Sequence, residues 1–160
     1  MKQLAVAVAV AVAACAHSDA EIKTAKLAQY SASPAQLYDL ALEVAQHKYK
    51  IATSDPEHFD FWTTPRFYSP EGDLQSEGAG GVVKIDNHSV QVAFHVAVVS
   101  TTPHSVALAV TPQTFQVLSG SPKPRELAPD DPYLPPFVLG RADELQFAIY
   151  DQARALVAGH

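Results

Sequence analysis

The chain has 160 residues, and 11 Lys or Arg against 17 Asp or Glu give it a formal net charge of −6 at pH 7. This acidic balance argues against a nucleic-acid partner and against a basic patch for anionic lipid head groups. A single cysteine rules out an internal disulfide and a zinc site built on several thiolates. The length suffices for one domain with its own hydrophobic core.

The N-terminus combines a basic start with an apolar run. Lys2 is followed by an uninterrupted apolar stretch from Leu4 to Ala14. A basic start, about 7–15 apolar residues and a small-residue cleavage site define a secretory signal. The run is shorter than the ~20 residues that span a bilayer as a helix. We therefore expect residues 1–14 to be a signal peptide.

The apolar run ends at Val12-Ala13-Ala14-Cys15, which contains the only cysteine. This tetrapeptide resembles the lipobox of bacterial lipoproteins, in which an aliphatic and two small residues precede an invariant cysteine. The resemblance implies that Cys15 is lipidated, begins the mature chain and anchors it by several acyl chains. Ala16, where the enterobacterial family has Asp for inner-membrane retention, implies the outer membrane, and we expect the domain on its periplasmic side rather than on the cell surface. The alternative is an ordinary signal cleaved after Ala14 or Ala16.

The remainder is expected to form a single domain. Residues 15–21 would be the lipidated cysteine and a short tether, and residues 22–160 would form the domain close to the membrane. Partial alternation of apolar and polar residues predicts a first strand over Lys23–Ser31.

The first helix is predicted from its start signal. Ser33-Pro34-Ala35-Gln36 combines a capping serine, a proline at the first helical position and a capping-box glutamine. Apolar residues then recur at helical spacing, and His47 and Lys48 suit the C-terminal end of the helix dipole. We expect this helix over about residues 34–48.

Two segments after this helix carry strand signals, and the second is rich in aromatic residues. Tyr49 to Thr53 alternates, and the aromatic strand runs from His58 to Tyr68 around Pro65. Strict alternation puts three residues of recognition type on one face of it: Trp62, Arg66 and Tyr68. Trp, Tyr and Arg are enriched in binding hot spots, so these three are candidate partner-binding residues. The alternative is that a loop covers them as a second small core.

The strongest strand signal lies in the middle of the chain. Val82–Asp86 and Ser89–Val99 are expected to pair as a hairpin around Asn87-His88, with Ile85 opposite Val90. Alternate residues from Val90 to Val98 make one bulky face, and the pattern continues from Val106 to Val110.

A Pro-rich segment separates this sheet from the last helix. Half of the 12 prolines lie between Ser121 and Pro136, and we expect a long loop over about residues 112–136. Apolar residues at helical spacing predict a second helix over about residues 141–157.

These elements predict an α+β fold in β-α-β-β-β-β-α order. An antiparallel sheet of about five to six strands and two helices would form a two-layer sandwich. The order resembles the helix-grip architecture, in which a curved antiparallel sheet wraps a C-terminal helix. That architecture occurs in steroidogenic-lipid-transfer-like proteins and in the C lipoprotein of the outer-membrane β-barrel assembly machine.

Motifs for metal binding and catalysis are missing from the sequence. The 7 histidines include no His-x-x-x-His or His-Glu-x-x-His spacing, and His95 and His104 are expected far apart along the sheet. Ser121 lacks the Gly-x-Ser-x-Gly elbow, and Asp130-Asp131 beside Pro132 suits a turn. We expect no metal, no cofactor and no enzymatic activity.

The sequence therefore predicts a membrane-anchored envelope lipoprotein whose non-enzymatic periplasmic domain binds a protein partner. The first alternative is a small-molecule or lipid carrier of helix-grip type, which requires an enclosed apolar cavity. The second is a hydrolase, which requires a cleft with convergent, pKa-perturbed groups. The pattern leaves the oligomeric state open.

Overall fold

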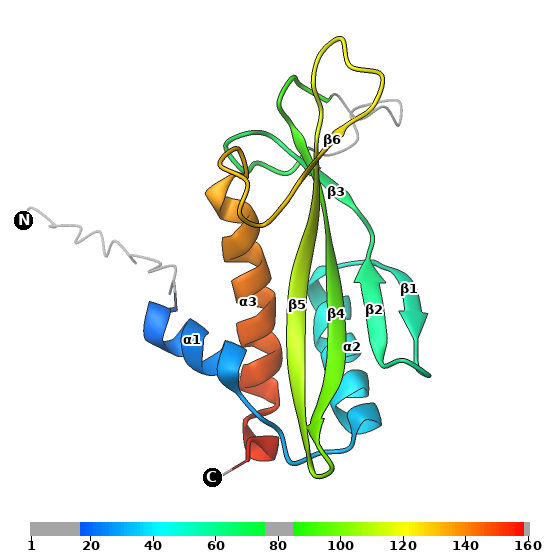
Figure 1. Cartoon of the computed structure of the whole chain (residues 1–160), viewed down its shortest axis with the longest axis vertical. Helices are drawn as coiled ribbons and strands as arrows, with labels where there is room; N and C mark the ends of the chain where they lie inside the picture. Colours follow the sequence, from blue (N-terminus) through cyan, green and yellow to red (C-terminus); the bar gives the residue numbers. More distant parts are fainter. Residues whose placement is uncertain (1–16, 76–84, 159–160) are drawn as a thin grey trace, which may run out of the picture.

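The structure, a computed structural model, describes residues 17–75 and 85–158. Helices cover one face of a six-stranded antiparallel sheet (Figure 1). The elements are α1 (Asp19–Leu27), α2 (Pro34–Lys48), β1 (Ile51–Asp55), β2 (Asp60–Thr63), β3 (Arg66–Tyr68), β4 (Val90–Thr102), β5 (Ser105–Gln116), β6 (Arg125–Leu127), α3 (Pro136–Gln152) and the 3-10 helix η1 (Arg154–Leu156). The predicted α+β sandwich is confirmed, with three α-helices in place of two. The expected signal peptide and Cys15 lie outside the described residues.

The first described element is a helix, so the predicted strand over Lys23–Ser31 is wrong. The Ser18 hydroxyl accepts a hydrogen bond from the Glu21 amide at 3.3 Å, and the Glu21 carboxylate accepts one from the Ser18 amide at 2.8 Å. This capping box starts α1 at Asp19, inside the segment expected to be a tether. The helix buries Ala25 and lies against α3.

The strand order is β1-β2-β4-β5-β6, and β3 pairs with β4 beyond the end of β2. The predicted hairpin around Asn87-His88 is wrong as far as its residues are described. Val90 pairs with Tyr68 of β3 on one side and with Gln116 of β5 on the other, so neither side is free for Ile85. Val82, Val83 and Lys84 lie outside the described residues.

The segment predicted as a Pro-rich loop, residues 112–136, contains two strand segments. β5 continues to Gln116, and β6 pairs with its last three residues. The second helix, predicted over about residues 141–157, begins earlier, at Pro136, because proline suits the first helical position. It ends at Gln152, and η1 follows it. The helix α2 has the predicted bounds.

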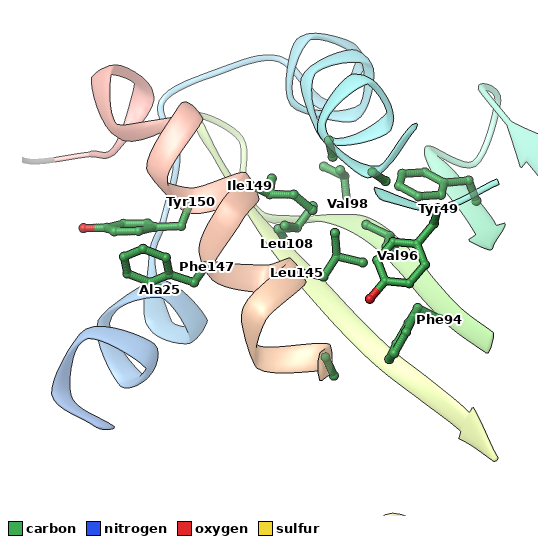
Figure 2. Packing of buried hydrophobic residues seen from close by; sticks show 14 of the residues in the cluster. Ala25, Tyr49, Phe94, Val96, Val98, Leu108, Leu145, Phe147, Ile149 and Tyr150 are labelled. Carbon is green, nitrogen blue, oxygen red and sulfur yellow. The ribbon is translucent and has the colours of Figure 1, made fainter. Parts of the chain in front are cut away.

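The core lies between the sheet and the helices. The face of β4 that carries alternate residues from Val90 to Val98 is buried against α2 and α3 (Figure 2). From α3, Val138, Leu145 and Ile149 fill the space opposite, each at most 2% exposed. The interior is thus occupied by packed side chains.

The edge of β5 that β6 leaves uncovered pairs with a single residue and with one side chain instead of a full strand. The Tyr30 amide donates to the Val106 carbonyl at 2.8 Å. Further along β5, the buried Gln146 side chain accepts from the Val110 amide at 3.1 Å and donates to the carbonyls of Leu108 at 3.2 Å and Ala25 at 3.3 Å. These contacts satisfy backbone groups that an edge strand would otherwise expose. They also tie α1, α3 and β5 together.

Candidate functional site

The structure separates the three predicted partner-binding residues, so they do not form one patch. Trp62 ends up on the sheet face away from the helices, whereas Arg66 and Tyr68 pair with the core-facing Val92 and Val90. The reason is the break at Thr64 and Pro65 between β2 and β3, which shifts the alternation by one residue.

Tyr68 is a core residue, at 2% exposure. Its ring lies 5.6 Å from that of Phe137 and 4.7 Å from the Arg141 guanidinium carbon. Arg66 is also held structurally, because its Nη2 donates to the Lys48 carbonyl at 2.8 Å and its guanidinium carbon lies 4.8 Å from the Tyr49 ring centre. Tyr68 is therefore inaccessible to a partner, and the partly exposed Arg66 side chain is engaged in contacts within the chain.

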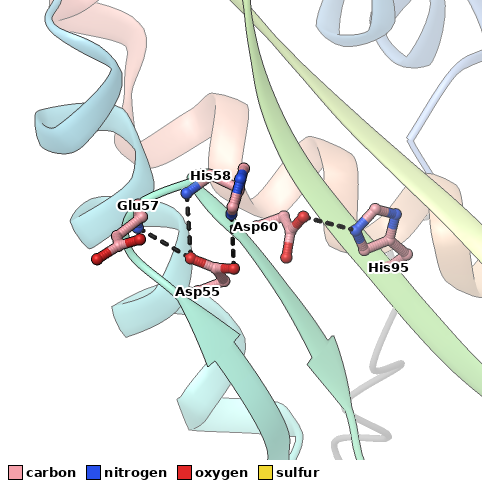
Figure 3. A network of polar contacts seen from close by, with 5 residues as sticks. All are labelled: Asp55, Glu57, His58, Asp60 and His95. Atoms are coloured by element: carbon pink, nitrogen blue, oxygen red, sulfur yellow. Dashed lines mark hydrogen bonds and ion pairs between the residues drawn. The ribbon is translucent and has the colours of Figure 1, made fainter.

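Trp62 is half-buried and stacks on His95, the residue opposite it on β4. The ring centroids are 4.4 Å apart and the ring planes differ by 16°. The Nε2 atom of His95 lies 3.5 Å from an Asp60 carboxylate oxygen, in a pair that is about one-third exposed (Figure 3). Two strands therefore hold a Trp–His–Asp cluster on the sheet face away from the helices, which we call the outer face.

A groove of about 530 Å³ runs from this cluster across the outer face. Its floor includes Thr111 and Gln113 of β5, and its far wall is Glu126 to Pro129 at the end of β6. Glu126 makes no ion pair or hydrogen bond with the residues that the structure describes. We call this the outer groove; it joins an aromatic wall, a carboxylate and an apolar Pro-rich rim.

A second polar cluster lies at the nearby β1–β2 turn. The Asp55 carboxylate accepts from the backbone amides of Glu57 and His58, at 3.0 and 3.1 Å, and lies 2.7 Å from the His58 ring nitrogen Nδ1 (Figure 3). The hydrogen bond with Asp55 raises the pKa of His58, and the same bond lowers the pKa of the Asp55 carboxyl. Both side chains are solvent-exposed, so this cluster shapes the turn.

Another groove, of about 700 Å³, lies on the opposite side of the molecule, between α2 and α3. Leu40, Val44 and Phe147 form apolar walls, and Glu43 and Asp151 lie on its lining. His17 lines this groove too, with its ring stacked 3.6 Å from that of Phe147. His17, the first described residue, therefore lies on the helical side, away from the outer face.

The described residues contain no group of three or more His, Cys, Asp or Glu arranged to hold a metal ion. Buried tyrosines account for the largest pKa shifts: burial raises the pKa of Tyr30 and of Tyr49 to about 12. Both belong to the core. No helix in residues 17–75 and 85–158 has the length and apolar character needed to cross a membrane.

Sequence reasoning found Trp62 but missed His95 as its partner and Glu126 as the opposite wall. His95 was recognisable only as a polar residue in a strand, because its contact with Trp62 depends on the β2–β4 register. Comparison with known proteins matched neither a family model nor a curated protein to this chain.

Proposed function

We propose that this chain is an outer-membrane lipoprotein, anchored by Cys15, whose non-enzymatic periplasmic domain binds a protein partner. The anchoring half of the proposal is supported by the lipobox-like Val12-Ala13-Ala14-Cys15 at the end of an apolar leader. His17, which packs against the domain, is only two residues after Cys15, so a lipidated cysteine would hold the domain close to the membrane.

The observation that carries the binding half is the outer face itself. No helix packs on it in the described residues, and it holds a half-buried tryptophan beside the outer groove. Tryptophan is enriched in binding hot spots, where the surrounding contacts of the interface exclude water. Trp62 replaces the predicted trio as the residue expected to contribute most to binding.

The carrier alternative is less well supported, because its cavity would have to lie between the sheet and α3. That space is filled by Leu145, Ile149 and the β4 valines. For the hydrolase alternative, no hydrogen bond joins His95 to a hydroxyl group of the described residues in the outer groove, so no nucleophile is activated there.

The anchor is tested by the intact mass of protein purified from membranes, beside a Cys15→Ala variant. We expect a chain that begins at Cys15 and carries acyl chains, and an unlipidated Cys15→Ala variant. A soluble, unmodified chain that begins after Ala14 or Ala16 would refute the lipoprotein proposal.

Partner binding is tested by co-purification from detergent-solubilised membranes. We expect Trp62→Ala to lose a protein that the wild type retains, with an unchanged circular dichroism spectrum. Tyr133→Ala is the matched control, because Tyr133 is a 65% exposed aromatic residue away from the outer groove lining. Equal loss in both variants, or in neither, would count against Trp62 as the contact residue.

A further inference from the structure

The outer face has an unbalanced distribution of charge. The strand register directs three carboxylates to this face: Asp55, Asp60 and Glu126. No lysine or arginine of the six described strands shares it, because Arg66 and Arg125 pair with the core-side residues Val92 and Gln116. Among the residues of the six strands this face is thus acidic, and no helix of the described residues packs on it.

The three carboxylates differ in their contacts within the chain. Asp55 and Asp60 each face a histidine, at 2.7 and 3.5 Å. Glu126 has no such partner among the described residues and lies on the groove wall. A cation that enters the outer groove therefore meets an unpaired carboxylate at one end and the Trp62–His95 ring pair beside Asp60 at the other.

Aromatic faces and carboxylates attract the same kind of ligand. A guanidinium or ammonium group is stabilised when it lies over a tryptophan ring, and a neighbouring carboxylate stabilises it further. An acidic surface also accelerates the approach of a basic partner.

The register sets the length of segment that fits. His95 pairs with Thr111 and Glu126 pairs with Phe115, so the two ends lie two strands apart across the sheet and four residues apart along β5. With ~4.8 Å between strands and ~3.4 Å rise per residue, their backbones are about 17 Å apart. The first and fifth Cα atoms of an extended segment are ~14 Å apart, and long side chains such as Arg or Lys reach over the remaining few ångströms.

We propose that the outer groove binds an extended basic segment of the protein partner, about five residues long, with one Arg or Lys near Trp62 and another near Glu126. This inference deepens the proposed function and rests on it, since it names the chemistry of the partner. It predicts that binding weakens as salt concentration rises, because the contacts are between exposed charges.

The test uses the intrinsic fluorescence of the whole chain, because Trp62 is its only tryptophan. The probes are the capped pentapeptides Arg-Thr-Val-Thr-Arg and Gln-Thr-Val-Thr-Gln. We expect a saturable change in emission with the arginine peptide, and binding of the glutamine peptide about ten-fold weaker. Equal binding of both peptides, or no saturable change with the arginine peptide, overturns the inference.

Two charge-neutralising variants locate the binding. Glu126→Gln is expected to weaken binding of the arginine peptide about three-fold, as for a single exposed ion pair. Asp39→Asn removes the same charge from the exposed side of α2 and is expected to bind as the wild type does. Equal weakening in both variants would mean attraction to net charge alone and would also overturn the inference.

The experiments distinguish a wrong partner chemistry from a wrong proposed function. A membrane partner that co-purifies through Trp62, combined with equal binding of the two peptides, would leave the proposed function standing with a partner of other chemistry. A partner that never depends on Trp62 would remove the proposed function itself.

Discussion

Tyr68 and Trp62 are only six positions apart, but the structure predicts that their removal lowers the free energy of unfolding by different amounts. Tyr68→Ala deletes a ring that is 2% exposed and packed against Phe137 and Arg141. Aromatic-to-alanine substitutions in a core cost about 3–5 kcal/mol, because the lost contacts leave a cavity. We expect Tyr68→Ala to lower the free energy of unfolding by about 4 kcal/mol, a large part of the ~5–15 kcal/mol typical of a domain.

Trp62→Ala removes a half-buried ring whose stacking partner in this structure is His95. The stacking contributes about 1 kcal/mol beyond the area that it buries, and the buried part of the ring adds about 1 kcal/mol more, so we expect a loss of about 2 kcal/mol. Urea denaturation followed by circular dichroism measures both variants, since fluorescence would lose its reporter. The reasoning is refuted if Trp62→Ala costs as much as Tyr68→Ala, or if Tyr68→Ala stays within 1 kcal/mol of the wild type.

Three further predictions concern stability and protonation. Gln146→Leu removes three hydrogen bonds and leaves buried backbone groups unpaired. We therefore expect urea denaturation to show that the free energy of unfolding falls by about 3 kcal/mol. An unchanged denaturation midpoint would contradict this. Tyr30 and Tyr49 have pKa values of about 12 in the folded state against the ordinary 10.0, so their contribution to stability is complete below pH 10 and falls as the pH rises towards 12. Thermal melts that stay constant across that window would refute it. The raised pKa of His58 should fall towards its ordinary value in Asp55→Asn, as measured by NMR titration; an unchanged value would exclude the hydrogen bond as its cause.

Elements with complete local signals were predictable from sequence. The helix over residues 34–48 carries its capping serine, its proline and its apolar stripe within one segment, and it has the predicted bounds. The alternation from Val90 to Val98 likewise predicted which face of β4 is buried. In both cases the signal does not depend on another part of the chain.

The wrong predictions have two causes. In some segments two short sequence patterns favour different structures, and elsewhere the structure depends on contacts with distant parts of the chain. The partial alternation after Glu21 suggested a strand, whereas the Ser18–Glu21 capping box starts a helix. Two residues at the Thr64–Pro65 break moved Tyr68 into the core and left Trp62 outside. The groove opposite Trp62 could not be foreseen, because β6 reaches it only through its pairing with β5.

The central claim is that the outer face of a membrane-anchored domain contacts a protein partner. Photo-crosslinking in native membranes tests it most directly, with the photoreactive residue at Gln113 on the groove floor and, as a control, at Asp39 on α2. The account predicts a discrete adduct from position 113, none from position 39, and loss of the adduct in the Cys15→Ala background. Adducts from position 39 alone, or none from position 113 in membrane-bound protein, would contradict it.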